Sequence, residues 1–448
     1  MISAIFERFV ENTAVTVMVR GIMERIFAEE KLEKVFEDNA ENQYTKNLLF
    51  SNIVELMGMV VCGIYPSIHA AYMACQKTLG VSKVALYAKI NGQESKVSQA
   101  LARYSGEELA SIRTEFKEAN QEILKGYEVR IIDGNHIGGT EHRLKVLREE
   151  RAAALPGQAI AVLDPQRELV VDVFPEEDAH AQERSLLPQV LETVQKHQLW
   201  IADRNFCTHD FLKGISNKQA YFIIREHLGI GWTKITELKE KGRNESGILF
   251  EHQVKLNSGL LVRRIVIKLE NPTRHGDKEV WFLTNLPVED ASTALVADLY
   301  LKRWQIEKMF QVITDIFKCE LKTMGYPKAA LFNFCMAMVA FNILSVVKGA
   351  MKEVHGSQKV DAALSNYYVV EEVQSNFRGM EVAIPSQEWE SFAQMTIPEF
   401  AKTLLIWAQK VNLKRFLSSP RGIKKPVKKL KNTPKRPHVA TFRLLNPD

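Results

Sequence analysis

Three carboxylates stand at positions in the sequence where they could do chemistry. Asp133 ends the strand-like run 129–132, Asp203 ends the apolar run 199–202, and Glu307 lies in a later helical stretch. The carboxyl end of a buried strand is the usual place for a reactive side chain in an open α/β sheet. A single strand-end aspartate is more often a cap or turn residue. The three together form an all-oxygen set that suits Mg²⁺ or Mn²⁺.

Such a set predicts a particular reaction class. Two divalent ions about 3.5–4 Å apart can activate an attacking oxygen and stabilise a leaving oxygen in phosphoryl transfer. We therefore predict that Asp133, Asp203 and Glu307 are both the catalytic residues and the ligands of two Mg²⁺ or Mn²⁺ ions.

The element expected to position Glu307 is an amphipathic helix over 298–318. Helical spacing places Tyr300, Arg303, Glu307 and Lys318 on one polar strip, with Trp304 beside it. On this strip, the phenol of Tyr300, the guanidinium of Arg303 and the carboxylate of Glu307 follow one another at spacings of about one helical turn. Such a face could bind a phosphate. A solvated face of i,i+4 ion pairs is an equally good interpretation of this stretch alone.

The motifs around the three carboxylates resemble those of a known family. They are Asp133-Gly, Asp203-Arg-Asn-Phe and Tyr300-x2-Arg303-Trp-x-Ile-Glu307-x2-Phe310. They are similar, in type, order and setting, to the DDE transposases of bacterial insertion sequences, in the branch marked by Tyr-x2-Arg-x3-Glu-x6-Lys. One departure is that the lysine of this signature falls on Thr314, and Lys318, four residues further on, is the expected substitute.

The resemblance implies an α/β fold with an RNase H-like catalytic domain over 126–350. The residue pattern predicts its strands, in the order of that fold, at 129–133, 159–163, 168–174, 199–203 and 221–224. In that fold the first and fourth strands are neighbours, so Asp133 and Asp203 would meet. Within about 226–285 the residue pattern predicts further strands at 247–256, 260–269 and 279–283. This segment resembles the β-rich insertion that the family carries before its glutamate.

The resemblance also implies contacts with DNA. Tyr300 and Arg303 would grip a phosphate next to the scissile bond, the arginine through paired charge-assisted bonds. The expected DNA-binding set is Tyr300, Arg303, Trp304, Lys318, Arg204 and Arg225. In the insertion, Arg263, Arg264, Lys268, Trp232 and Trp281 could contact phosphate and stack on bases, although core packing is the commoner role of a single tryptophan.

The regions outside the catalytic domain are expected to be helical or basic. Residues 1–125 have helical spacing, and 81–104 could form either a helix-turn-helix-like unit that reads transposon ends or part of a plain bundle. Residues 351–418 are also expected to be helical. From 411 to 448 there are eleven Lys or Arg and one acid, whereas the whole chain has a net charge of +5. The tail 419–448 is therefore predicted to be a basic arm for the nucleic-acid backbone.

Composition limits the class of protein. The chain has 448 residues, 46% of them hydrophobic and 25% charged, which is typical of a globular protein with several domains. Its five cysteines show no CxxC spacing, and the N-terminus lacks the pattern of a signal peptide. The uncharged run 329–347 approaches membrane-spanning length, but its two asparagines and small residues favour a buried core helix. We expect a cytoplasmic protein without a membrane span.

The combined interpretation is a DNA transposase that cuts at the ends of its insertion sequence and joins the freed 3′-hydroxyl ends to target DNA. Two ends are processed together, so the resemblance implies at least a homodimer on DNA. Two alternatives remain open at this point. One is a domesticated or inactive DNA-binding relative, and the other is a two-metal nuclease that cuts without joining.

Overall fold

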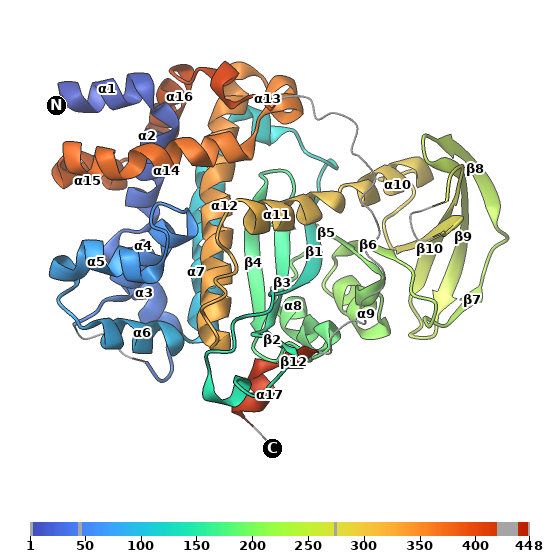
Figure 1. The fold of residues 1–448 in the computed structure, drawn as a ribbon. Coiled ribbons are helices and arrows are strands. Elements are labelled where there is room, and N and C mark those ends of the chain that lie inside the picture. The colour runs from blue at the N-terminus through green and yellow to red at the C-terminus, as the bar shows by residue number, and fades with distance from the viewer. Residues whose placement is uncertain (1–2, 44–46, 273–275, 419–437, 447–448) are drawn as a thin grey trace.

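The computed structural model describes residues 3–43, 47–272, 276–418 and 438–446 as a mixed α/β fold. A helical body, a central sheet and a β-rich extension follow one another across the molecule (Figure 1). The catalytic carboxylates predicted from the sequence all come from the middle part.

Helices from both ends of the chain form the helical body. The N-terminal ones are α1 (Ala4–Asn12), α2 (Ala14–Ile26), α3 (Glu29–Asn39), α4 (Phe50–Val61), α5 (Ile68–Leu79), α6 (Lys83–Asn91), α7 (Ser95–Thr114) and the 3₁₀ turn η1 (Lys117–Asn120). The C-terminal ones are α12 (Pro327–His355), α13 (Ser357–Ala363), α14 (Asn366–Ala383), α15 (Ser386–Gln394), α16 (Ile397–Gln409) and η5 (Leu413–Phe416). α2 packs against α14, α15 and α16, so the two helical ends of the chain share one core.

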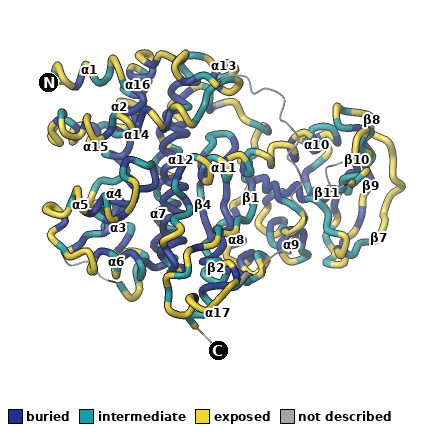
Figure 2. The backbone as a smooth tube through the Cα atoms, viewed as in Figure 1, coloured by how far each residue is buried: buried dark blue, intermediate teal, exposed yellow. Residues whose placement is uncertain are grey.

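α12 is the centre of this body, and it corresponds to the uncharged run of the sequence. By length and composition it could cross a membrane, but 94% of its most apolar 18-residue window is buried inside the protein, and Figure 2 shows it as a buried tube. The expectation of a buried core helix is confirmed. Asn342 bonds both the N–H and the C=O of Val170 at 2.7 and 2.8 Å, and thereby fixes α12 against the central sheet.

The expected helix-turn-helix-like unit has its first helix as predicted. Ser82 caps α6 by accepting a hydrogen bond from the N–H of Ala85, and Gly92 follows its last residue. The second helix, α7, is longer than expected and packs one face along α12 and strand β4.

The core of the central sheet has strands β1 (Glu128–His136), β3 (Gln158–Asp164), β4 (Leu169–Glu176), β5 (Gln198–Ala202) and β6 (Tyr221–Arg225). Their order is β4-β3-β1-β5-β6. β1 pairs antiparallel with β3 and parallel with β5, and β5 pairs parallel with β6. The five predicted strands and the adjacency of the first and fourth are therefore confirmed.

Side chains alternate between the two faces of these strands. Ile131 and Ile201 belong to the core shared with the helical body, whereas Ile132 and Ala202 belong to a second core. The second core lies under α8 (Leu187–Thr193) and α9 (His209–Asn217), which follow the 3₁₀ turns η3 (Glu183–Leu186) and η4 (Arg204–Phe206). Both faces of the strands are covered, which explains their nearly continuous apolar sequences.

The β-rich extension continues the same sheet. Its strands are β7 (Trp232–Lys234), β8 (Lys239–Asn244), β9 (Gly247–Leu256), β10 (Leu261–Leu269) and β11 (Glu279–Thr284), and β11 pairs with β6. The predicted strands β9, β10 and β11 are confirmed. β7 and β8 were not predicted, because β8 has the polar sequence KEKGRN and is exposed along most of its length.

The predicted continuous helix over 298–318 is wrong. The structure has two helices, α10 (Thr293–Leu301) and α11 (Trp304–Asp315), separated by Lys302 and Arg303. The N–H of Arg303 bonds the carbonyl of Tyr300, three residues back, so the chain tightens locally into a 3₁₀ turn. α11 ends at Asp315, and Lys318 therefore does not lie on the helical strip of Glu307.

The basic tail contains ordered structure at its end. Residues 419–437, which carry eight of its Lys and Arg, lie outside the described residues. After them, β12 (His438–Ala440) pairs with β2 (Ala153–Leu155), and α17 (Thr441–Leu445) packs near the 3₁₀ turn η2 (Lys145–Leu147). The end of the predicted basic arm, at 438–445, is therefore docked on the protein.

Candidate active site

The neighbouring strands β1 and β5 place the two aspartates side by side. In the parallel pair, Ile132 is opposite Ala202, so Asp133 and Asp203 follow as the next residues of neighbouring strands. Neighbouring strands lie about 4.8 Å apart. Both residues are half-buried. Asp203 follows the last residue of β5, whereas β1 continues past Asp133 to His136 and stays paired with β3. The expected end of the first strand at Asp133 is therefore wrong.

Asp133 is partly removed from solvent and lies among charged side chains. Its Oδ1 accepts a hydrogen bond from the N–H of Gly134 at 2.9 Å, and its Oδ2 accepts one from Nη1 of Arg303 at 2.9 Å. Burial raises the pKa of Asp133 to about 6, against the lowering effects of Arg303 and the Gly134 N–H, and the carboxylates of Asp203 and Glu183 raise it further. The neighbouring negative charge is thus only partly compensated.

Glu307 reaches the same place from α11. It lies in the first turn of this helix, and its Oε1 accepts a hydrogen bond from Nη2 of Arg303 at 2.6 Å. Arg303 therefore joins Glu307 to Asp133 through its two terminal nitrogens. The Arg303 side chain is 11% exposed and that of Glu307 is 37% exposed, so the carboxylate faces solvent and the guanidinium lies beneath it.

Tyr300 lies behind this group. It is 8% exposed, and its ring centroid is 4.4 Å from that of Phe282 on β11. Burial and the nearby Asp203 raise the pKa of Tyr300 to about 12, despite the opposing effect of Arg303. The phenol therefore stays protonated at neutral pH and can donate a hydrogen bond.

The other predicted DNA-contacting residues have different settings. Trp304 is 55% exposed next to Arg303, whose guanidinium lies 5.8 Å from its ring centroid. Arg204 is exposed, and its N–H bonds Oδ1 of Asp203 at 2.6 Å. Arg225 ends β6 and forms an ion pair with Asp277 at 2.8 Å. The structure thus brings Tyr300, Arg303 and Trp304 to the carboxylates, whereas Arg204 contacts Asp203 through its backbone N–H alone.

Lys318 lies elsewhere. Its N–H bonds the carbonyl of Val61, and its Nζ donates to the carbonyls of Tyr65 and Pro66 at 3.4 and 3.2 Å. These contacts point it at the end of α4. The expectation that Lys318 replaces the family lysine on the strip of Glu307 is therefore not supported by its position.

In the β-rich extension, two arginines are engaged within the protein. Arg263 is 5% exposed, and it forms two bonds to Glu251 at 2.9 Å. Arg264 lies between Trp232 and Trp281, 4.4 and 3.5 Å from their ring centroids, and pairs with Glu226 at 2.7 Å. Arg263 is thus a structural residue, contrary to the expected phosphate contact.

The structure adds one further residue, Glu183, to the site. Glu183 begins η3, and its carboxylate lies over Gly134, where a Cβ would come within 2.1 Å of its Oε1. No motif or spacing in the sequence links Glu183 to either aspartate, so its position was found only from the structure.

The chemistry of these groups fits divalent cations. Asp133, Asp203, Glu183 and Glu307 surround one cation, Arg303, which leaves a clear excess of negative charge. Within the described part of the chain, no three acidic, histidine or cysteine side chains are arranged to hold a metal ion. At this site the Arg303 guanidinium lies between Asp133 and Glu307 and bonds both. The carboxylates could close on a cation once this guanidinium moves, and hard carboxylate oxygens suit Mg²⁺ or Mn²⁺.

Of three comparisons with known proteins, one supports this type of site. Residues 124–343 match the family model of the transposase DDE domain, a match that supports a DDE transposase. A comparison with curated proteins gave no match. Among solved structures, the chain is similar to a piggyBac transposase in a synaptic complex with hairpin DNA, with 8% identity, 86% of each chain covered and a TM-score of 0.42. A likeness at that level carries no argument about this chain.

Proposed function

We propose that this chain is a metal-dependent DNA transposase of a bacterial insertion sequence. The observation that carries the proposal is the meeting of Asp133, Asp203 and Glu307 at one edge of the sheet, within the segment that matches the transposase DDE domain. We infer that this segment is RNase H-like, which the strand order β4-β3-β1-β5-β6 supports.

The proposed reaction has two steps at the same site. Water attacks a phosphodiester at the end of the element and releases a 3′-hydroxyl, which then attacks a phosphodiester of target DNA. Two divalent cations, when bound, would supply activation of the attacking oxygen and stabilisation of the leaving oxygen. Asp133, Asp203 and Glu307 would hold them.

The neighbouring side chains would hold the DNA strand. Arg303 is bonded to Asp133 and Glu307 at 2.9 and 2.6 Å, and a positive charge arriving at these carboxylates would release its guanidinium toward a phosphate oxygen. Tyr300 keeps its proton and would donate one hydrogen bond to the same strand. Trp304 offers an exposed ring for contact with a base or sugar.

The protein would act on two DNA ends at once, so we propose that it forms a homodimer in the DNA complex. We also propose that it is located in the cytoplasm. Arg204 and Arg225 are proposed to contact the DNA backbone beside the site. Lys318 would contact DNA near α4, away from the catalytic carboxylates. The basic segment 419–437 would contact DNA without sequence preference.

The decisive experiment uses the full chain, DNA carrying the ends of its element and a supercoiled target plasmid, with Mg²⁺. Joined end–target product is expected with wild-type protein and not with Asp203→Ala. Cut ends without any joined product would identify a nuclease. Retained end binding without either product would identify an inactive DNA-binding relative.

A further inference from the structure

Glu183 reaches the catalytic edge of the sheet from the face opposite Glu307. Its 3₁₀ turn η3 leads into α8, and Leu186 and Leu187 of this segment belong to the core under α8 and α9. Glu307 comes from α11 on the other face, which packs against β1. Asp133 and Asp203 therefore lie between two carboxylates that arrive from opposite sides.

Gly134 leaves space for the Glu183 carboxylate, because it has no side chain. A Cβ on residue 134 would lie 2.1 Å from Oε1, 2.6 Å from Cδ and 3.3 Å from Cγ of Glu183. Real Cβ atoms essentially never come within 3.0 Å of another atom, so a side chain at 134 would require the flexible end of Glu183 to move. Gly134 does not have a left-handed conformation in this structure, so its lack of a side chain serves the approach of Glu183 rather than a turn.

The turn that carries Glu183 is tied to the segment that follows Asp203. Nε of Arg184 donates to the carbonyl of Asn205 at 2.8 Å, and Nδ2 of Asn205 donates weakly to Oε2 of Glu183 at 3.4 Å. These contacts link η3 to η4. The Glu183 carboxylate is thus held beside both aspartates by the backbone segments around it.

Among the described residues, Glu183 differs in its partners from two other shielded carboxylates, Asp172 and Glu226. In the described residues no Lys or Arg forms an ion pair with it, and its Oε1 accepts no hydrogen bond there. By contrast, Asp172 pairs with Arg103 at 2.7 Å and Glu226 pairs with Arg264 at 2.7 Å. A carboxylate that is placed next to Asp133 without a cation adds cost to the folded protein, unless another positive group occupies the site.

We propose that Glu183 is a fourth carboxylate of the catalytic site and supplies an oxygen ligand to the divalent cation held by Asp133. This inference rests on the proposed metal-dependent function and extends it to a residue outside the Asp, Asp, Glu motif. Its function is to bind a cation together with the strand-end aspartates, and Gly134 is the position that permits this.

The test is binding of Mn²⁺ to the full chain, followed by electron paramagnetic resonance, which reports free and bound ion without any turnover. Glu183→Gln keeps the size and the bond with Asn205 but removes the charge, and it should weaken Mn²⁺ binding roughly 10- to 100-fold. Glu192→Gln on α8 is the matched control and should bind as wild type does.

Two further variants separate metal binding from a structural role. Asn205→Ala removes the bond between η4 and Glu183, and should leave Mn²⁺ affinity within about twofold. Gly134→Ala should weaken binding as Glu183→Gln does, because its methyl group displaces the carboxylate. Added to Glu183→Ala, it should cause little further loss. Thermal unfolding of each variant checks that it is folded.

The outcomes distinguish this inference from the proposed function. If Glu183→Gln binds Mn²⁺ as wild type does while Asp203→Ala does not, the inference is overturned and the proposed function stands. If Asn205→Ala loses as much affinity as Glu183→Gln, Glu183 has only a structural role. If Asp203→Ala also binds normally, the proposed metal site itself fails.

Discussion

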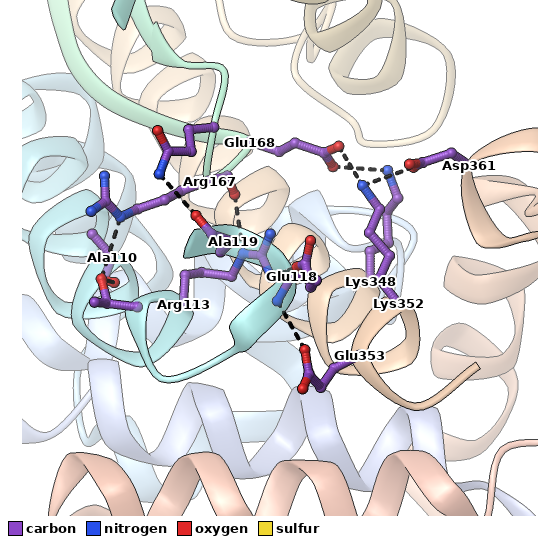
Figure 3. Close-up of polar contacts among 12 residues, drawn as sticks. Ala110, Arg113, Glu118, Ala119, Arg167, Glu168, Lys348, Lys352, Glu353 and Asp361 are labelled. Carbon is purple, nitrogen blue, oxygen red and sulfur yellow. Dashed lines mark hydrogen bonds and ion pairs between the residues drawn. The ribbon is translucent and has the colours of Figure 1, made fainter. Parts of the chain in front are cut away.

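Two groups of charged side chains in this protein have opposite balances. The strand-end cluster consists of Asp133, Asp203, Glu183, Glu307 and Arg303. The α12 network consists of Arg113, Glu118, Glu168, Lys348, Lys352 and Asp361, and Figure 3 shows how its side chains face one another. The first has four acids and one cation, whereas the second has three acids and three cations.

The balance decides how each carboxylate behaves. Glu168 accepts from Lys352 at 2.6 Å and from Lys348 at 3.2 Å. Although burial alone would raise the pKa of Glu168, these two ammonium groups lower it to about 2. Asp133 is half-buried, and the single Arg303 guanidinium does not offset the effect of desolvation. The pKa of Asp133 is therefore raised to about 6. A paired network stabilises the fold, whereas the unpaired cluster is suited to receive cations.

The largest expected difference between the two groups is in catalysis. Asp133→Ala, Asp203→Ala and Glu307→Ala should each reduce cleavage of end DNA by at least about 10³-fold, because each removes a ligand that places a cation. Gel-shift binding to the same DNA should persist, since affinity comes mainly from basic contacts. A variant that cleaves near the wild-type rate would remove that residue from the site.

The next difference is in stability. Glu168→Gln leaves Lys348 and Lys352 without their shared partner and should lower the free energy of unfolding by about 2–4 kcal/mol, because breaking a mostly buried ion pair strands the remaining charge. Asp133→Asn removes an unfavourable charge and should not lower it. Urea unfolding at neutral pH without divalent metal measures both. Equal destabilisation would contradict the contrast.

The pH dependence should separate the two groups in the same way. The native protein keeps the proton of Asp133 up to about pH 6, whereas the unfolded chain loses it near 3.8. Without metal, the stability contributed by this group is therefore present at low pH and lost as the pH rises between about 4 and 6.

Metal binding should show the opposite trend, because the cation needs the ionised carboxylate. Mn²⁺ affinity should fall as the pH drops through about 6. Glu168 stays ionised in this range, so the α12 network should contribute equally throughout. Calorimetric titration from pH 5 to 8 measures the trend, and an affinity independent of pH would contradict it.

The smallest effect is expected from the basic segment 419–437, whose eight Lys and Arg have no acids among them in the sequence. Replacing these eight residues by Gln should weaken binding to all DNA alike and flatten its salt dependence, because fewer counterions are released. This change is preferable to deletion of 419–448, which would also remove the docked strand β12. Loss of end preference at an unchanged salt slope would show that the segment reads sequence.

The main features of the fold and the motif carboxylates could be predicted because they have local signals. Apolar runs that end in Asp133 and Asp203 mark buried strands, and β9 and β10 were predicted from their alternation. β8 could not be, since exposed polar residues form it through pairing with β9. The break between α10 and α11 has no Gly or Pro to mark it. The end of α11 at Asp315 has none either, so Lys318 was placed on the wrong surface.

Contacts between distant segments account for the rest. Glu183 lies 49 positions after Gly134 in the sequence, and no periodicity connects the two. Its place in the site depends on how η3 packs beside β1. β12 likewise depends on pairing with β2, after a segment whose composition predicts no packed structure. Such features require the three-dimensional arrangement of the chain.

The central claim is that the strand-end cluster is a cation site and the α12 network is not. The most direct test is the thermal unfolding midpoint of wild type, Glu168→Gln and Asp133→Ala, each with and without Mn²⁺ at neutral pH. A ligand that binds the native state raises this midpoint, so Mn²⁺ should raise it in wild type and in Glu168→Gln, but not in Asp133→Ala. An equal rise in Asp133→Ala, or none in wild type, would contradict the claim.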